Sequence, residues 1–173
     1  MQIVSFVLNA LGLLSVILAS LIKGEKMKQV LFLIFLSNVL VATGYLLSTN
    51  GINGAVSGYL GGAQSIVNYQ FESKNKPLPK WLIALYALSF IAANLIFGGF
   101  NFYTLLAIAA CMGFIAGILQ KNGKNYRLCT VGVTAIWSVY DILTKSYNGL
   151  MTHGTLFFVN LVGILIHDLK KNK

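Results

Sequence analysis

Charge is scarce in this chain. Only 10% of its 173 residues are charged and only four are acidic, whereas 57% are hydrophobic and the mean hydropathy is +0.75. A soluble domain carries roughly a quarter charged residues, so this composition leaves no room for a soluble domain. The two prolines, Pro77 and Pro79, share one short connector. No proline therefore interrupts a long apolar run.

Cysteine and histidine are equally rare, with two of each. Cys111 and Cys129 lie within or at the edge of apolar runs, which argues against a disulfide framework and favours packing roles. His153 and His167 have no cysteine or carboxylate partners at a recognisable metal-ligand spacing. We therefore expect no metal and no cofactor.

What the chain does have is long apolar runs, and about 20 such residues span the hydrocarbon core of a bilayer. Seven runs predict an all-α integral membrane protein with seven transmembrane helices. The predicted spans are Gln2–Ile22, Val30–Leu47, Ala55–Phe71, Trp81–Phe97, Phe102–Leu119, Leu128–Thr144 and Leu150–Asp168. No charge precedes the first run, so we expect a retained helix rather than a cleaved signal peptide.

The basic residues alternate between connectors. Twelve of the thirteen follow the first, third, fifth and seventh spans, and the opposite side has only Lys145. This positive-inside bias predicts a bacterial cytoplasmic (inner) membrane protein with its N-terminus outside and its C-terminus inside. The net charge of +9 is thus explained without nucleic acid. The lipid bilayer is the expected partner, and a homo-oligomer is compatible with the sequence.

Two parts of the chain resemble each other. Tyr45 and Tyr140, and Asn53-Gly54 and Asn148-Gly149, are each offset by 95 residues. The offset predicts a parallel 3+1+3 repeat within a single membrane domain, residues 1–173. Residues 1–71 form the first three-helix bundle, 81–97 the linker helix and 102–168 the second bundle.

Several of these residues carry a family resemblance. Trp137-Ser138-Val139-Tyr140-Asp141, followed by Ser146, Gly149, Gly154-Thr155 and Asn160, resembles the end of the YgjV-type bacterial inner-membrane proteins. Gly44-Tyr45-Leu46-Leu47 through Gly54-Ala55 resembles the matching part of their first half. That family is similar to the 3+1+3 transporters, among them the bacterial nicotinamide riboside carriers and the SWEET sugar facilitators. The resemblance implies a facilitator with a central site between two bundles. SWEET-type proteins carry prolines in their repeat helices and this chain has none there, so the nicotinamide riboside carriers are the nearer comparison.

Polar residues inside the predicted spans are the candidate site, because lipid cannot satisfy them and they must face protein or water. Ser57, Gly61, Gln64 and Asn68 share one face of their helix by spacing. Asn38, Gln64, Asn68 and Asn160 are candidates to hydrogen-bond a neutral polar solute; the alternative is hydrogen bonding between helices. Tyr45 and His153, near the outer mouth, are candidate gate residues, and His153 is a candidate proton-responsive group.

Asp141 is the only acid well inside an apolar run. Three interpretations are open: an interfacial ion pair with Lys145 at the i,i+4 spacing, a role in ligand binding or proton coupling, or a buried neutral acid. Trp137 and Tyr140 share its helix face. They are candidates to stack on a planar ring of a solute, or they pack helices and line the membrane interface.

The function that these features favour is a facilitator for a small, largely uncharged polar metabolite, such as a nucleoside-like vitamin precursor or a sugar. It would work by alternating access at a site between two three-helix bundles. The alternative is a non-transporting receptor, sensor or partner subunit of the same fold. We do not expect an enzyme, because Asp141, His153 and His167 cannot converge: the two histidines lie about 21 Å apart along one helix.

Overall fold

The computed structural model is entirely α-helical over the residues that it describes, namely 2–21, 27–47, 51–120 and 123–167. It contains seven helices, as the apolar runs predict. Their bounds are α1 Gln2–Leu21, α2 Met27–Leu46, α3 Ile52–Ser73, α4 Lys80–Gly98, α5 Phe102–Ile118, α6 Gly123–Leu143 and α7 Tyr147–His167. The last residues predicted for the first and seventh spans, Ile22 and Asp168, lie outside the described residues.

The helices extend beyond the apolar runs at several ends. The helix α3 begins three residues before the predicted Ala55, and α6 begins at Gly123 rather than Leu128. Hydropathy marks only the part of a helix that suits hydrocarbon, and a helix continues into the headgroup region without an apolar sequence. The first turns of α6 accordingly contain Lys124 and Arg127.

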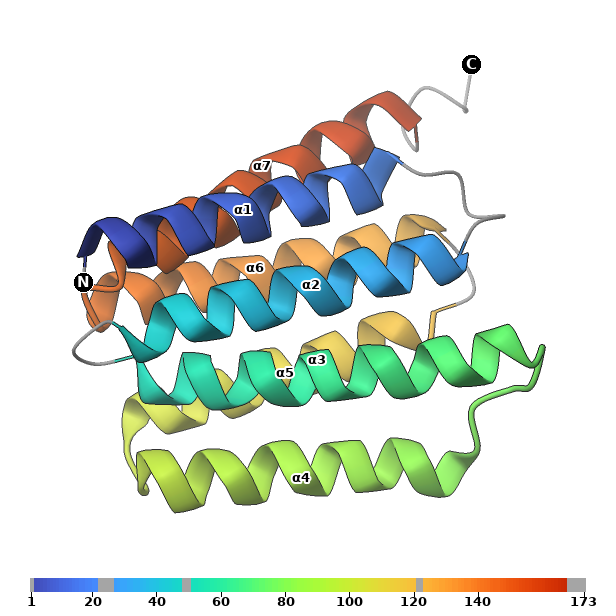
Figure 1. The fold of residues 1–173 in the computed structure, drawn as a ribbon, viewed down its shortest axis with the longest axis horizontal. Helices are drawn as coiled ribbons and strands as arrows, with labels where there is room; N and C mark the ends of the chain where they lie inside the picture. Colours follow the sequence, from blue (N-terminus) through green and yellow to red (C-terminus); the bar gives the residue numbers. More distant parts are fainter. Residues whose placement is uncertain (1, 22–26, 48–50, 121–122, 168–173) are drawn as a thin grey trace.

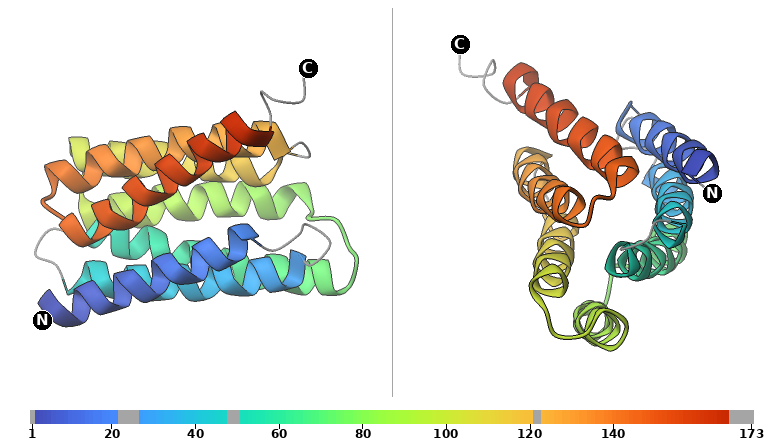
Figure 2. Two further views of the ribbon diagram at one scale, coloured as in Figure 1. Left: turned by 90° about the horizontal axis from the view of Figure 1, so that it is seen from above. Right: turned by 90° about the vertical axis from the view of Figure 1, so that its left-hand side faces the viewer.

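The seven helices run roughly parallel or antiparallel to one another (Figure 1). Viewed end-on, α1, α2 and α3 form one row, α7, α6 and α5 form a second row, and α4 stands at one end between them (Figure 2, right). At the edge with α4, helices α3, α4 and α5 pack together, and at the other edge α7 packs on α1 and α2. We call these sets the first row (α1–α3) and the second row (α5–α7).

The burial pattern is that of a protein solvated by lipid. Large apolar side chains point outwards, including Ile3, Leu88, Ile96 and Phe158, each at least 65% exposed. Polar side chains are buried instead, including those of Asn9, Asn94, Thr104 and Asp141. Among the described residues two helices, Lys28–Leu46 and Lys80–Gly98, are long and apolar enough to cross a membrane, and Ile3–Ala19 and Phe102–Gly117 are shorter apolar helices.

Candidate functional site

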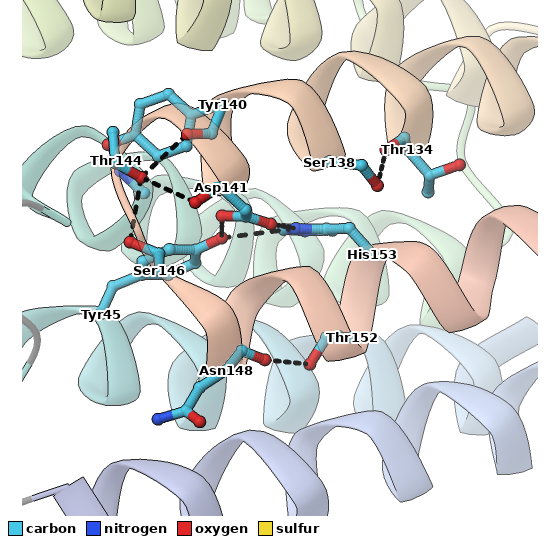
Figure 3. A network of polar contacts seen from close by, with 11 residues as sticks. Tyr45, Thr134, Ser138, Tyr140, Asp141, Thr144, Ser146, Asn148, Thr152 and His153 are labelled. Atoms are coloured by element: carbon cyan, nitrogen blue, oxygen red, sulfur yellow. Dashed lines mark hydrogen bonds and ion pairs between the residues drawn. The ribbon is translucent and has the colours of Figure 1, made fainter.

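A buried cluster of three ionisable side chains joins the two rows. Tyr45 is near the end of α2, Asp141 near the end of α6 and His153 in the second turn of α7. The Tyr45 hydroxyl donates to Asp141 Oδ1. His153 Nδ1 lies 2.8 Å from Asp141 Oδ2, and the side chains of these two residues are 14% and 0% exposed (Figure 3). The carboxylate thus has one partner in each row and no contact with solvent.

Asp141 does not pair with Lys145. The helix α6 ends at Leu143, and Lys145 then takes a positive φ of 56° and is exposed. Both carboxylate oxygens are occupied by Tyr45 and His153. The spacing of four residues predicts a pair only while the helix continues, so this interpretation of Asp141 is wrong.

The tight turn between α6 and α7 holds the carboxylate in place. The Ser146 backbone N–H donates to the Asp141 carbonyl at 2.8 Å, and the Thr144 hydroxyl donates to the Tyr140 carbonyl at 2.9 Å. The Tyr140 carbonyl also accepts from the Thr144 backbone N–H at 2.9 Å, so both carbonyls at this helix end are paired. Asp141 is therefore fixed close to the first turn of α7.

Two glycines make room for the tyrosine of the cluster. A Cβ on Gly149 would collide with the Tyr45 hydroxyl and lie 2.7 Å from Asp141 Oδ1. A Cβ on Gly54 would lie 2.8 Å from the Tyr45 ring. Both distances are shorter than a van der Waals contact. Only glycine therefore permits this approach of α7 and α3 to α2.

Aromatic rings surround His153. The Trp137 ring is stacked on the imidazole, with centroids 5.4 Å apart and planes at 14°. Tyr140 meets Trp137 edge-on at 5.2 Å. Trp137 and Tyr140 are 9% and 1% exposed, so the stacking partner of Trp137 in this structure is His153.

An open pocket of about 430 Å³ lies at the same end of the bundle as this cluster. It is lined by Ile52, Asn53, Gly98, Asn101, Tyr103, Tyr140, Leu143 and Thr144. These residues come from the ends of α3, α4, α5 and α6 beside the connectors that carry few charges. Tyr140 lines the pocket and directly precedes Asp141 on α6, whereas Tyr45, Asp141 and His153 themselves do not line it.

The remaining candidate residues do not join this cluster. Gln64 is 2% exposed, and neither atom of its carboxamide has a hydrogen-bond partner. Asn38 is half-buried with its Nδ2 unpartnered, whereas Asn68 Oδ1 accepts from the Tyr86 hydroxyl of α4 at 3.0 Å. Asn160 donates to the Leu156 carbonyl of its own helix. Asn68 and Asn160 are thus internally bonded, while Asn38 and Gln64 retain unused polar atoms.

Two cross-row hydrogen bonds were missed by the sequence interpretation. Asn53 at the start of α3 donates to Thr104 in the first turn of α5 at 3.0 Å. Asn148 at the start of α7 donates to Ser5 in the first turn of α1, also at 3.0 Å. The 95-residue offset relates Asn53 to Asn148, and that offset was the one sequence signal available for them.

The tyrosines at this offset have reciprocal contacts. The Tyr140 hydroxyl accepts from the Gly54 N–H at 3.3 Å. The Tyr45 hydroxyl in turn lies against Gly149. Tyr140 thus packs on Gly54, which lies nine residues after Tyr45, and Tyr45 packs on Gly149, which lies nine residues after Tyr140. The ring centroids of the two tyrosines are 6.5 Å apart.

A buried carboxylate, buried carboxamides and outward apolar side chains all indicate a membrane protein, and comparison with known families agrees. The model of the YgjV family, described as bacterial inner membrane protein, matches residues 2–171. The chain belongs to the YgjV family of bacterial inner membrane proteins. No curated protein and no solved structure shows significant similarity to it.

Membership of the YgjV family confirms two of the sequence predictions, the family itself and the bacterial inner membrane. The number of crossings, the orientation and the repeat stay predictions, as does the relation to 3+1+3 transporters. Within the described residues, no group of three or more histidine, cysteine or acidic side chains is arranged to hold a metal ion.

Proposed function

We propose that this YgjV-family protein is a facilitator that moves a small, largely uncharged polar metabolite across the bacterial inner membrane. In this proposal all seven helices cross the bilayer, with the N-terminus outside, and the two rows alternate access to a site between them. The shortest helix, α5, has 17 residues, which is about 26 Å at 1.5 Å per residue. That length approaches the thickness of the hydrocarbon core.

One observation carries the proposal: an open pocket and a buried ionisable cluster use neighbouring residues of α6, Tyr140 in the pocket lining and Asp141 in the cluster. A pocket of about 430 Å³ is within the range of small-molecule sites. Ionisable residues buried in membrane proteins commonly mark solute or ion pathways. Further along α3, Gln64 offers a donor and an acceptor that no protein group uses. Leaving such groups unsatisfied in a dry interior is costly, which favours water or a polar solute beside them.

The reciprocal contacts support the two-bundle arrangement. The 95-residue offset relates the contact of Tyr45 with Gly149 to the contact of Tyr140 with Gly54. To within a turn of helix, it also relates the hydrogen bond Asn53–Thr104 to the hydrogen bond Asn148–Ser5. Contacts that exchange in this way are expected where two similar halves face each other across an approximate two-fold axis. Rocking of one row against the other is then the natural motion for transport.

Binding is tested first by thermal stability of the purified protein in detergent. The panel is nicotinamide riboside, thiamine, nucleosides, nucleobases and simple sugars, each at millimolar concentration. A ligand at 100 times its dissociation constant adds about 2.7 kcal/mol to the stability of the folded state. We expect at least one compound to stabilise the protein.

Two variants on α3 then locate the site. Gln64→Leu removes a buried carboxamide without breaking a described hydrogen bond, and Gln70→Leu, at an exposed position six residues on, is its control. We expect only Gln64→Leu to abolish the stabilisation. A hit that survives Gln64→Leu would exclude Gln64 from the site. Saturable binding without flux would favour the receptor or partner-subunit alternative.

A further inference from the structure

The cluster of Tyr45, Asp141 and His153 has no counterpart in the first half of the chain. At the 95-residue offset, Asp141 corresponds to Leu46 and His153 corresponds to Gly58, whereas Tyr45 corresponds to Tyr140. The tyrosine–glycine packing therefore forms in both halves, but the carboxylate and the imidazole are present in only one.

The charge of this cluster depends on a single proton. Around Asp141 the titratable side chains of the described residues are Tyr45 on α2, Tyr140 on α6 and His153 on α7. No lysine or arginine of the described part pairs with it, and Lys145 points to solvent. With a neutral imidazole the cluster carries one negative charge, and with an imidazolium its net charge is zero.

We propose that Tyr45, Asp141 and His153 form a proton-binding site that controls closure of the solute facilitator at this end of the bundle. This inference rests on the proposed function. The proton adds to Nε2 of the neutral imidazole, whose Nδ1 lies 2.8 Å from Asp141 Oδ2, and leaves from the same nitrogen. No bond other than N–H forms or breaks. His153 is the partly exposed member of the pair, so it lies between the buried carboxylate and the nearest accessible surface.

The proton state favours different arrangements of the two rows. An unpaired carboxylate buried in low dielectric is strongly destabilised, whereas a hydrogen-bonded pair of opposite charges is tolerated. The closed arrangement, with Asp141 fully buried between the rows, therefore favours the proton-loaded cluster. Loss of the proton favours separation of the rows at this end, so that water reaches Asp141.

The predicted orientation gives the side from which the proton comes. The cluster lies at the end of the bundle with the weakly charged connectors, which is the predicted outer end. A proton taken up from outside therefore favours closure of this end, and its loss to the outside favours opening. Solute uptake is accordingly expected to depend on the external pH.

Stacking of Trp137 on His153 provides an optical test of proton binding. The chain has two tryptophans, and Trp81, which is 64% exposed, can be replaced by Phe so that Trp137 is the sole reporter. An imidazolium stacked on indole quenches its fluorescence more strongly than a neutral imidazole does. We expect the emission of Trp81→Phe to fall sigmoidally as the pH is lowered from about 9 to about 5, the range in which histidine ordinarily changes charge.

The controls identify the group that titrates. Adding His153→Gln should remove the transition, and adding His167→Gln, the other histidine of the chain, should leave it. Size-exclusion profiles at each pH verify that the protein stays folded. Absence of a transition, or its persistence in His153→Gln, would overturn the proton site.

The effect on transport is tested in proteoliposomes at a series of external pH values. Uptake of the solute identified by thermal stability should change with the external pH for the wild-type protein and not for His153→Gln. Uptake that is independent of the external pH, or that keeps its dependence in His153→Gln, would overturn the proton-controlled closure while leaving the proposed facilitator intact. If none of the solutes crosses the membrane, the proposed function itself fails and the control of closure with it.

Discussion

Replacement of Gly149 by alanine is the sharpest perturbation of the buried cluster. The added methyl group would collide with the Tyr45 hydroxyl oxygen and lie 2.7 Å from Asp141 Oδ1. Overpacking of this kind costs about 1–3 kcal/mol. If Tyr45 moves away instead, a hydrogen bond to a charged group is lost, worth about 1.5–3 kcal/mol.

The gain of helix propensity from Gly to Ala, about 1 kcal/mol, offsets part of either cost. We therefore expect Gly149→Ala to lower the free energy of unfolding by about 0.5–2 kcal/mol. For a chain of this length each kcal/mol corresponds to about 2–4 °C in Tm. Thermal denaturation in detergent, followed by tryptophan fluorescence, measures the difference directly.

Gly154→Ala is the matched control on the same helix. A Cβ at Gly154 would meet nothing within 4 Å, so only the helix propensity changes and Tm should rise slightly or stay constant. Gly132→Ala on α6 is a second control with the same open surroundings. Equal melting temperatures for Gly149→Ala and Gly154→Ala would refute the described contact between Tyr45, Asp141 and α7.

Three further substitutions test the buried polar groups. Tyr45→Phe should destabilise the protein by about 1.5–3 kcal/mol because it leaves a carboxylate oxygen of Asp141 unpaired. Tyr59→Phe, the control, loses only an exposed hydrogen bond to Thr43 and should change Tm little; equal losses of stability in the two variants would contradict the buried Tyr45–Asp141 bond. Gln64→Leu should raise the unfolding free energy by about 1–3 kcal/mol, since the polar atoms of Gln64 have no protein partners; a loss of stability would indicate a partner for Gln64. The same variant should reduce solute flux at least about tenfold, a loss of about 1.4 kcal/mol of transition-state stabilisation. Asn94→Leu breaks buried hydrogen bonds to Ser57 and to the Phe90 carbonyl and leaves polar groups unsatisfied, so it should lower the unfolding free energy by about 2–4 kcal/mol. A denaturation assay measures this loss, and an unchanged Tm would refute the hydrogen bond between Asn94 and Ser57.

The sequence predicts the number of helices because each apolar run is long and charge-free. It predicts helix ends less well, as α6 illustrates. Lys124 and Arg127 precede the apolar run that begins at Leu128, yet they already lie within the helix. A basic side chain is compatible with helical backbone outside the hydrocarbon. Periodicity also groups Trp137, Tyr140 and Asp141 correctly on one face of α6.

The partners of Asp141 are where prediction from the sequence stops. Local spacing offers only Lys145, four residues on, whereas the observed partners Tyr45 and His153 are 96 and 12 residues away. Finding them requires knowledge of which helices are neighbours, and apolar runs contain little information on helix packing. The same holds for Asn53, whose bond to Thr104 depends on α3 lying beside α5.

The most direct test of the central claim is the flux of a stabilising solute into proteoliposomes. The account predicts saturable uptake with the wild-type protein, uptake at background with Asp141→Asn, and normal uptake with Glu72→Gln, which neutralises an exposed acid at the end of α3. Saturable binding of the solute with no uptake by a folded, correctly reconstituted wild-type protein would contradict a facilitator.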